Sequence, residues 1–224
     1  MSELEIFETQ DGSHSVLSHQ FGVSYHSKYG AIQETRHVFI EAGLFQQALK
    51  KTNLHILDVG FGTGLNAYLT LLESHKRNLT VRYDAVEKFP MQEEKVKQLN
   101  YTEEVPATEE EKEWFEAMHQ CSWGEWHSIT PDFELFKHQM DIQSVDFEER
   151  FDVIYYDAFA PSAQPELWEE PVMERMQRAL VPGGILVTYC AKGAFKRALK
   201  GLGFEVETLQ GPPGKREMTR AVKS

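Results

Sequence analysis

The fold of this 224-residue chain is decided by Leu54-His55-Ile56-Leu57-Asp58-Val59-Gly60-Phe61-Gly62-Thr63-Gly64. The first six residues read as a buried strand, and three alternating glycines follow them directly. Residues 65–72 then continue with the apolar spacing of a helix. Glycines between a strand and a helix let the backbone turn sharply and approach a ligand closely. The stretch therefore predicts a strand-turn-helix unit of an open α/β sheet, with a ligand at the turn.

Strands and helices alternate along the rest of the chain. Strands are expected at residues 80–86, 134–139, 151–156 and 185–189, and helices at 91–99, 166–180 and 193–202. An antiparallel pair is expected at 204–209 and 217–222, around the turn Gly211-Pro212-Pro213-Gly214. Alternation of this kind indicates a parallel sheet that is covered by helices on both faces.

Two segments differ from this alternating pattern. Residues 1–30 are expected to form an extended arm with a hairpin, because Asp11-Gly12 lies between two apolar runs. Residues 101–128 predict an acidic insertion with a helix from Glu109 to His119. We therefore expect the α/β domain to occupy residues 31–224, beginning with a helix over residues 31–49.

The composition is typical of a soluble globular protein, with 41% hydrophobic and 26% charged residues. The net charge of −12 argues against binding nucleic acid by charge alone, although residues 191–224 are locally basic. No apolar run approaches the ~20 residues that span a bilayer, and the N-terminus lacks the pattern of a signal peptide. Cys121 and Cys190 are isolated, so we expect two thiols in a cytoplasmic protein.

A second stretch, Tyr156-Asp157-Ala158-Phe159-Ala160-Pro161, follows the strand predicted at residues 151–156. It places one carboxylate at the carboxyl end of a buried strand, where open α/β sheets build their active sites. The segment Gln164-Pro165-Glu166-Leu167-Trp168 then opens a helix. Asp157 is therefore a candidate catalytic residue from its position alone.

The spacing of the glycine turn indicates which cofactor it would hold. A dinucleotide site wants G-x-G-x-x-G, whereas Asp58 to Gly64 has alternating glycines and resembles the S-adenosylmethionine turn of class I methyltransferases. Glu87 ends the next strand and can accept both hydroxyls of a ribose, a feature that both cofactor classes share. Asp141 follows the strand at 134–139, where class I methyltransferases commonly carry an acid that meets the adenine.

At this point the chain resembles the tRNA 5-aminomethyl-2-thiouridine methyltransferase family, which comprises the MnmC methyltransferase domain and its stand-alone form, MnmD. The resemblance is carried by the glycine turn through Asn66 and by Tyr156–Pro161 with Pro165-Glu166-Leu167-Trp168. Residues 30–39 and Gly214-Lys215-Arg216-Glu217-Met218 agree with it as well. The match runs from about Tyr25 to Ala221. It implies a class I Rossmann-like fold with a seven-stranded, mostly parallel sheet and an antiparallel pair of strands at the C-terminus.

The resemblance also implies a reaction. A methyl group would pass from S-adenosyl-L-methionine to the primary amine of 5-aminomethyl-(2-thio)uridine at the wobble position of tRNA. Asp157 would orient the amine, stabilise the charge that grows on it, or accept its proton as a general base. The predicted cofactor contacts are Tyr25, Glu34, Asp58, Gly60, Gly62, Gly64, Asn66, Glu87, Lys88, Asp141 and Asp157.

The tRNA would be met by aromatic and basic side chains. Phe159 is expected to wall the site or stack on the target base, and basic residues are expected to meet phosphates. The predicted substrate contacts are Phe159, Pro161, Lys196, Arg197, Lys215 and Arg216. No metal is implied, since none of the nine histidines forms a close pair of the kind that binds zinc. The flavin-dependent oxidase domain to which the family is often fused is not expected in this chain.

Other readings of the same residues stay open. An aminopropyltransferase of the spermidine-synthase type has a similar glycine turn and an acid after the fourth strand, although Ala158, Phe159 and Ala160 would clamp a polyamine poorly. A methyltransferase for a different amine, or a non-catalytic module that binds an adenosine ligand or RNA, would also fit the turn. A dehydrogenase that uses NAD fits least, because of the glycine spacing.

Overall fold

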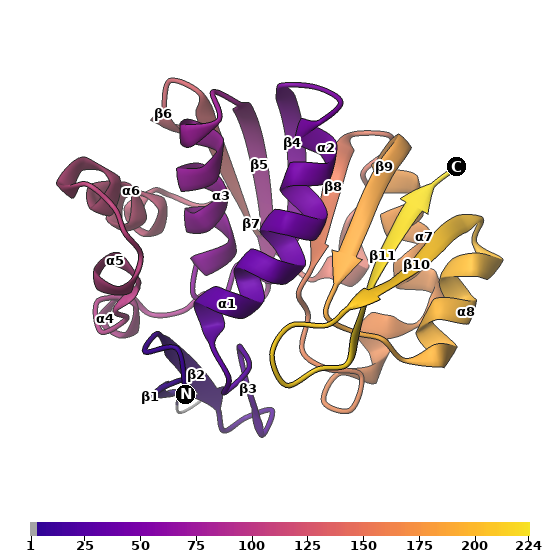
Figure 1. Ribbon diagram of the computed structural model, residues 1–224, viewed down its shortest axis with the longest axis horizontal. Helices are drawn as coiled ribbons and strands as arrows, with labels where there is room; N and C mark the ends of the chain where they lie inside the picture. The colour runs from indigo at the N-terminus through magenta and orange to yellow at the C-terminus, as the bar shows by residue number, and fades with distance from the viewer. Residues whose placement is uncertain (1–3) are drawn as a thin grey trace.

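A computed structural model describes residues 4–224 and has a large mixed sheet as its central layer (Figure 1). The eight strands lie in the order β10-β11-β9-β8-β4-β5-β7-β6. Their bounds are β4 (Asn53–Val59), β5 (Thr80–Glu87), β6 (Trp126–Thr130), β7 (Phe133–Gln139), β8 (Phe151–Tyr156), β9 (Leu180–Thr188), β10 (Phe204–Gln210) and β11 (Glu217–Lys223). Strands β7, β5, β4, β8 and β9 are parallel, whereas β11 and β10 continue the sheet antiparallel. The predicted Rossmann-like α/β fold with its antiparallel C-terminal pair is confirmed.

The sheet has one strand more than the seven that were expected. Strand β6 pairs antiparallel with β7 at the edge, and it begins in the last three residues of the insertion predicted at residues 101–128. Trp126 of β6 packs edge-on against Phe136 of β7, with ring centroids 5.3 Å apart. An aromatic pair across neighbouring strands stabilises a hairpin, which explains why these residues extend the sheet instead of continuing the insertion.

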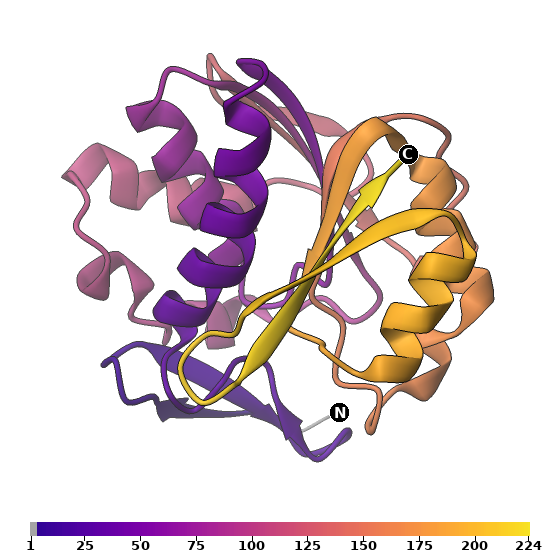
Figure 2. The same cartoon turned by 45° about the vertical axis from the view of Figure 1, so that its right-hand side comes forward.

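Helices cover both faces of the sheet, as Figure 2 shows. One face carries a long helix made of α1 (Ala31–Thr35), a π-helical η1 (Arg36–Leu44) and α2 (Phe45–Ala48), together with α3 (Leu65–Lys76). The other face carries α7 (Glu170–Ala179) and α8 (Gly193–Gly201). Strand β8 connects the two cores by simple alternation. Val153 and Tyr155 belong to one hydrophobic cluster, whereas Ile154 and Tyr156 belong to the other.

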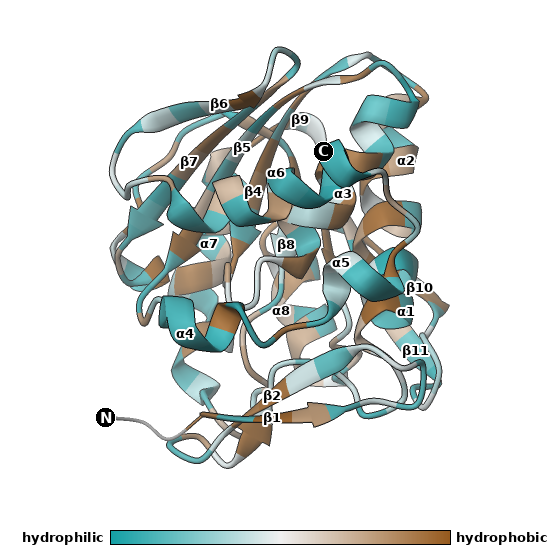
Figure 3. Ribbon diagram, turned by 90° about the vertical axis from the view of Figure 1, so that its left-hand side faces the viewer, coloured by the Kyte–Doolittle hydropathy of each residue, from teal (hydrophilic) through white to brown (hydrophobic). Residues whose placement is uncertain are grey.

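The N-terminal segment forms a small antiparallel sheet of its own, with β1 (Leu4–Glu8), β2 (His14–Ser18) and β3 (Val23–Ser24). It lies at the carboxyl ends of the parallel strands, below α1, α4 (Glu93–Val96) and α5 (Tyr101–Glu104) in Figure 3. The Asp11 carboxylate joins it to the long helix by accepting from the backbone N–H of Gln33 at 3.0 Å. Asn100 holds it from the other side, accepting from the His14 N–H at 2.7 Å.

Several helices are shorter or placed differently than expected. The helix expected at 91–99 is only α4 (Glu93–Val96), and the insertion holds α5 (Tyr101–Glu104) and α6 (Glu109–Gln120). The helix expected at 166–180 is a 3₁₀ turn, η3 (Pro165–Trp168), followed by α7. Strand β9 already begins at Leu180, because Leu180 pairs with Phe151 before a register shift through the Pro182-Gly183-Gly184 segment. No helix within residues 4–224 is long and apolar enough to cross a membrane.

Candidate functional site

A cavity of about 340 Å³ opens at the carboxyl ends of the parallel strands. This is the position at which open α/β sheets bind ligands, and the volume is within the usual range for a small-molecule site. Its wall combines the N-terminal arm, the glycine turn after β4, the ends of β5, β7 and β8, and the segment before α7. Residues far apart in the sequence are thus brought to one site.

The glycine turn is packed too tightly for any other residue at two of its positions. Gly62 and Gly64 have φ angles of +50° and +75°, in the left-handed region that favours glycine. A Cβ on Gly62 would lie 3.0 Å from the Tyr25 ring, and one on Gly64 would lie 2.5 Å from Nε2 of His119. The turn is therefore held between the N-terminal arm and the insertion.

Glu87 faces this turn from the end of β5. Its Oε2 accepts the Gly62 N–H at 3.1 Å, and its Oε1 accepts the Phe89 N–H at 2.7 Å. Both bonds fix the carboxylate in the cavity wall, and burial raises its pKa. A fixed carboxylate at this strand end has the chemistry to accept the hydroxyls of a ribose, as predicted from its position.

Lys88 and Asp141 lie farther along the same wall. The Lys88 Nζ donates to Asp141 Oδ2 at 2.8 Å, and Asp141 Oδ1 accepts the Gln143 N–H at 2.9 Å. Asp141 thereby caps the short 3₁₀ helix η2 (Ile142–Ser144), and its half-buried side chain lines the cavity. Strands β5 and β7 thus bring Glu87, Lys88 and Asp141 together.

Asp157 stands at the opposite wall, directly after β8. Its backbone N–H donates to the Val59 carbonyl at 3.1 Å, and its Oδ2 accepts from Asn66 Nδ2 at 3.0 Å. The Asn66 amide also donates to Oδ1 of Asp58 at 3.3 Å. The hydroxyl of Tyr83 donates to the other Asp58 oxygen at 2.8 Å. Asn66 therefore bridges two carboxyl groups.

Both of these carboxyl groups hold their protons more tightly than usual. Burial, followed by the charges of Glu34 and Asp58, raises the pKa of Asp157 well above its ordinary value. Burial also raises the pKa of Asp58 to about 7. A carboxyl group with a raised pKa is a stronger base than an exposed one, which suits Asp157 to accept a proton from a substrate.

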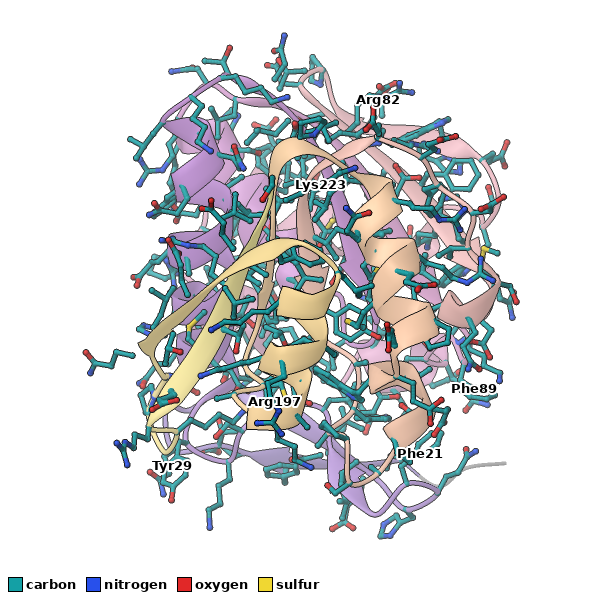
Figure 4. The ribbon with its side chains drawn as sticks, turned by 90° about the vertical axis from the view of Figure 1, so that its right-hand side faces the viewer. Phe21, Tyr29, Arg82, Phe89, Arg197 and Lys223 are labelled. Carbon is teal, nitrogen blue, oxygen red and sulfur yellow. The ribbon has the colours of Figure 1, made fainter. Side chains whose placement is uncertain are left out.

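Aromatic side chains line the mouth of the cavity. Phe159 contacts the Tyr25 ring edge-on with centroids 5.0 Å apart, and it lies 5.2 Å from the ring of Phe21. Phe21 in turn lies 6.2 Å from Phe89, which is 48% exposed. Figure 4 shows Phe21 and Phe89 side by side at the end of the molecule that carries the N-terminal sheet.

Phe21 and Phe89 were not among the residues predicted from the sequence. Phe21 belongs to the turn after β2, and only the contact between the arm and the main sheet brings it to the cavity. Phe89 could have been predicted from the sequence, because a large aromatic side chain is unexpected in the solvent-exposed loop that follows the end of a strand. Trp168 supports the same wall by donating from Nε1 to the Phe159 carbonyl at 2.8 Å.

The predicted basic contacts divide into two groups. Lys196 Nζ pairs with Glu217 at 3.0 Å, and Lys215 Nζ pairs with the buried Glu34 at 2.6 Å. Arg197 and Arg216 are exposed, and the Arg216 side chain is 94% accessible. Figure 4 shows Arg197 at the same end of the molecule as Phe21, whereas Arg82 and Lys223 lie at the opposite end.

Several predicted site residues lie apart from the cavity lining: Glu34, Asp58, Gly64, Pro161 and the four basic residues Lys196, Arg197, Lys215 and Arg216. The Glu34 carboxylate is engaged by Lys215 and by the Ser27 N–H, so both of its oxygens have partners within the chain. Pro161 begins the turn at residues 161–163, where the Ala163 N–H donates to the Ala160 carbonyl at 2.7 Å. Within residues 4–224 no group of three or more His, Cys, Asp or Glu side chains is arranged to hold a metal ion.

Comparisons with known proteins identify relatives of this chain. Residues 103–224 match a family described as S-adenosyl-L-methionine-dependent methyltransferase. A protein of Leptospira borgpetersenii serovar Hardjo-bovis is 30% identical over 213 residues and a protein of Chromobacterium violaceum is 29% identical over 222 residues. Both are named tRNA 5-methylaminomethyl-2-thiouridine biosynthesis bifunctional protein MnmC. The alignments cover 90% and 94% of this chain but only 32% and 33% of those proteins.

A solved structure has the same fold along nearly the whole chain. The crystal structure of MNMC2 from Aquifex aeolicus superposes with a TM-score of 0.81 at 27% sequence identity. The superposition covers 99% of this chain and 70% of that one. This chain therefore spans about one third of the length of its curated relatives but most of the length of this structure.

Proposed function

We propose that this chain, which belongs to the S-adenosyl-L-methionine-dependent methyltransferase family, methylates the primary amine of 5-aminomethyl-(2-thio)uridine at the wobble position of tRNA. The product would be 5-methylaminomethyl-(2-thio)uridine. The names of relatives that align with 90% or more of the chain support this substrate. A tRNA substrate would place the protein in the cytoplasm.

The observation that carries the proposal is the pairing of one buried carboxylate with an aromatic wall in a single cavity. Asp157 and Phe159 are two residues apart, and both line the cavity that also contains Glu87. A base with an attached amine needs a flat apolar surface for its ring and a polar group for its nitrogen. The aromatic wall with Phe21, Tyr25 and Phe159 suits a nucleobase better than it suits a linear polyamine.

The residues of the wall suggest how the cofactor would be held. S-adenosyl-L-methionine supplies an electrophilic methyl group on a positively charged sulfonium. Glu87 would accept the ribose hydroxyls, Asp141 would meet the adenine, and the glycine turn would lie against the methionine part. A cationic cofactor would favour the ionised forms of Asp58 and Asp157, whose pKa values are raised by burial in its absence. Tyr25 would then lie between the cofactor and the substrate base.

Asp157 would carry out the proton step that the reaction needs. An alkyl amine with a pKa near ~10.4 enters the cavity as an ammonium ion, which has no free lone pair. Transfer of its proton to the Asp157 carboxylate frees the nitrogen pair. The nitrogen then forms a bond to the methyl carbon as the carbon–sulfur bond breaks, and the electron pair of that bond stays on sulfur. Positioning of the amine in line with that bond can supply ~7–11 kcal/mol.

Docking of the tRNA would use the exposed basic residues near the cavity. Arg197 and Arg216 are exposed, whereas Lys196 is held in a surface ion pair with Glu217. The protein as a whole is acidic, so the contact would be local and its affinity should fall with added salt. The N-terminal arm predicted at residues 1–30, of which residues 1–3 lie outside the described structure, would contribute one wall of the substrate end through residues 4–30. Residues 31–224 would contribute the methyltransferase domain.

The test is incubation with labelled S-adenosyl-L-methionine and tRNA that carries the 5-aminomethyl group, followed by analysis of the nucleosides. We expect label in 5-methylaminomethyl-(2-thio)uridine. The Asp157→Asn variant should bind the cofactor but lose transfer by about 100-fold or more. Label in any other nucleoside would refute the substrate. Transfer of an aminopropyl group to putrescine from decarboxylated cofactor would instead support the polyamine reading.

A further inference from the structure

Lys215 is held in a more constrained position than a phosphate-binding lysine needs. It follows the turn between β10 and β11, and its Nζ donates to Oε1 of Glu34 at 2.6 Å. The same Nζ lies 3.8 Å from the centre of the Tyr189 ring. The Glu34 side chain is only 7% exposed. One lysine therefore joins the C-terminal hairpin to the first helix and to the end of β9.

The partners of this lysine reach the active site by short steps. The second oxygen of Glu34 accepts the Ser27 N–H at 2.8 Å, and Ser27 is two residues from Tyr25 in the cavity wall. The hydroxyl of Tyr189 donates to the Ala158 carbonyl at 2.8 Å. Ala158 directly follows Asp157. The Lys215–Glu34 pair is thus connected both to the arm and to the turn that carries the catalytic carboxylate.

We propose that Lys215 and Glu34 are positioning residues for methyl transfer, which act on the Asp157 carboxylate through their charges and through Tyr189. Lys215 is accordingly not a contact to tRNA phosphate. This inference rests on the proposed function of the same site, because it assigns how the carboxylate is held for the amine.

The charges around Asp157 show why a cation is needed there. The groups that face it are Glu34 from α1, Asp58 from β4, Asn66 from α3, Tyr83 from β5, Tyr189 after β9 and Lys215 from the turn before β11. Glu34 and Asp58 are acids that raise the pKa of Asp157 beyond the effect of burial, whereas Lys215 lowers it. Within this set Lys215 is the residue with a positive charge.

Removal of each partner should therefore change the proton affinity of Asp157 in opposite directions. Without the Lys215 charge, Asp157 would keep its proton to a higher pH and could not accept one from the substrate ammonium. Without the Glu34 charge, Asp157 would ionise at a lower pH. A lysine that only met phosphate would produce neither effect.

Arg216 provides the contrast within the same hairpin. Its side chain is 94% exposed, and its nearest acid, Glu217, is 3.9 Å away. It is therefore free to meet a phosphate, whereas Lys215 is engaged by a buried carboxylate and an aromatic ring. Neighbouring residues would thus have separate roles, one in docking and one in positioning.

The experiment compares Lys215→Met, Lys215→Arg, Glu34→Gln, Arg216→Met and the double variant that combines Lys215→Met with Glu34→Gln. Single-turnover methyl transfer to tRNA is measured from pH 6 to pH 9, and tRNA affinity is measured at several salt concentrations. The matched control is Lys51→Met, because Lys51 also pairs with a buried carboxylate, that of Asp152, at the opposite end of β8. Thermal unfolding of every variant checks that it is folded.

Lys215→Met should lower the rate at pH 7 by about 100-fold, the scale of a small misplacement of the reacting groups. The acidic limb of the pH–rate profile should move to higher pH in Lys215→Met and to lower pH in Glu34→Gln. In the double variant the limb should return toward its wild-type position. Lys215→Arg should restore part of the rate. Lys51→Met should keep the wild-type rate and profile. Arg216→Met should instead keep the wild-type rate and reduce the slope of the logarithm of tRNA affinity against the logarithm of salt concentration by about one.

The inference is overturned if folded Lys215→Met keeps its rate and pH profile but loses tRNA affinity with a smaller salt slope. It is also overturned if Lys215→Met and Glu34→Gln move the acidic limb in the same direction. Failure of the proposed function would look different, because the wild type itself would then transfer no methyl group to the tRNA.

Discussion

Replacement of Asp58 by Asn should change how the stability of the cofactor-free protein depends on pH. The Asp58 side chain is fully buried at the end of β4, where it accepts from Tyr83 at 2.8 Å and from Asn66 at 3.3 Å. Burial raises its pKa from 3.8 to about 7. The folded protein therefore binds this proton more tightly than the unfolded chain does.

The sign and the size of the effect follow from this difference. Below pH 3.8 the group is protonated in both states and contributes no pH dependence. Between pH 3.8 and about 7 only the folded state keeps the proton, so the free energy of unfolding falls as pH rises. Each pKa unit corresponds to ~1.4 kcal/mol, so the ionised group destabilises the fold by ~4 kcal/mol above pH 7. Asn cannot ionise, but its amide accepts one fewer hydrogen bond, which costs ~1–3 kcal/mol.

The stability of Asp58→Asn relative to the wild type should therefore rise with pH. At pH 5 the wild type has already lost ~1.6 of the ~4 kcal/mol, so the variant should lie between ~1.4 kcal/mol less stable and ~0.6 kcal/mol more stable. At pH 9 it should be more stable by ~1–3 kcal/mol. Urea unfolding at both pH values measures the difference directly. A difference that is the same at pH 5 and pH 9 would contradict the reasoning.

Asp84 of β5 is the matched control for this experiment. It is also fully buried, but hydrogen bonds from His138 and His55 and the charge of Arg150 outweigh its burial and lower its pKa. A depressed pKa gives stability that is present above the unfolded value and is lost as pH falls through the folded one. Asp84→Asn should therefore be less stable than the wild type at both pH 5 and pH 9, without a change of rank.

Three further predictions concern the cofactor and the insertion. Binding of S-adenosyl-L-methionine at pH 7 should release up to about half a proton from Asp58, because a nearby cation favours the ionised form; calorimetry in buffers of different ionisation enthalpy would show no buffer dependence if this is wrong. Glu87→Gln should weaken cofactor binding by about 10- to 100-fold, measured by calorimetry, and an unchanged affinity would remove Glu87 from the ribose site. Lys137→Met should lower the free energy of unfolding in urea by about 3 kcal/mol, because the buried Nζ donates to the carbonyls of Met118 and His119 at 2.8 and 3.0 Å; an exposed-site effect below ~0.5 kcal/mol would contradict this role.

Local signals predicted the part of the site that is built from neighbouring residues. The turn from Asp58 to Gly64 combines a buried strand, alternating glycines and a helix start, and each of these is visible within a few residues. The same holds for Asp157, which follows an apolar strand directly. Such elements need no tertiary information, and the structure brings both turns to one cavity.

The features that escaped prediction depend on contacts between distant segments. The Glu34–Lys215 bond joins residues 181 positions apart, and no local pattern distinguishes Lys215 from the exposed Arg216 beside it. Phe21 reaches the cavity only because the arm folds onto the carboxyl ends of the strands. Strand β6 was not predicted, because its stability comes from pairing with β7 and not from its own composition. The π-helical geometry of η1 was not predicted either, because the spacing of its apolar residues does not distinguish a π-helix from an α-helix.

The buried acids near the cavity also explain why the methyl donor would bind more tightly than its demethylated product. Asp157, Asp58 and Glu87 are all buried enough that their pKa values are raised, so each is costly to ionise while the cavity holds no cation. A sulfonium beside them would offset that cost, and binding would be favoured by charge as well as by shape. Methyl transfer moves the positive charge from sulfur to the substrate nitrogen, which leaves a neutral thioether in the cofactor position. The same carboxylates that favour the methyl donor would then hold its product less tightly, and release of the accepted proton to solvent would return Asp157 to a carboxylate that pairs with the charged amine until the tRNA leaves.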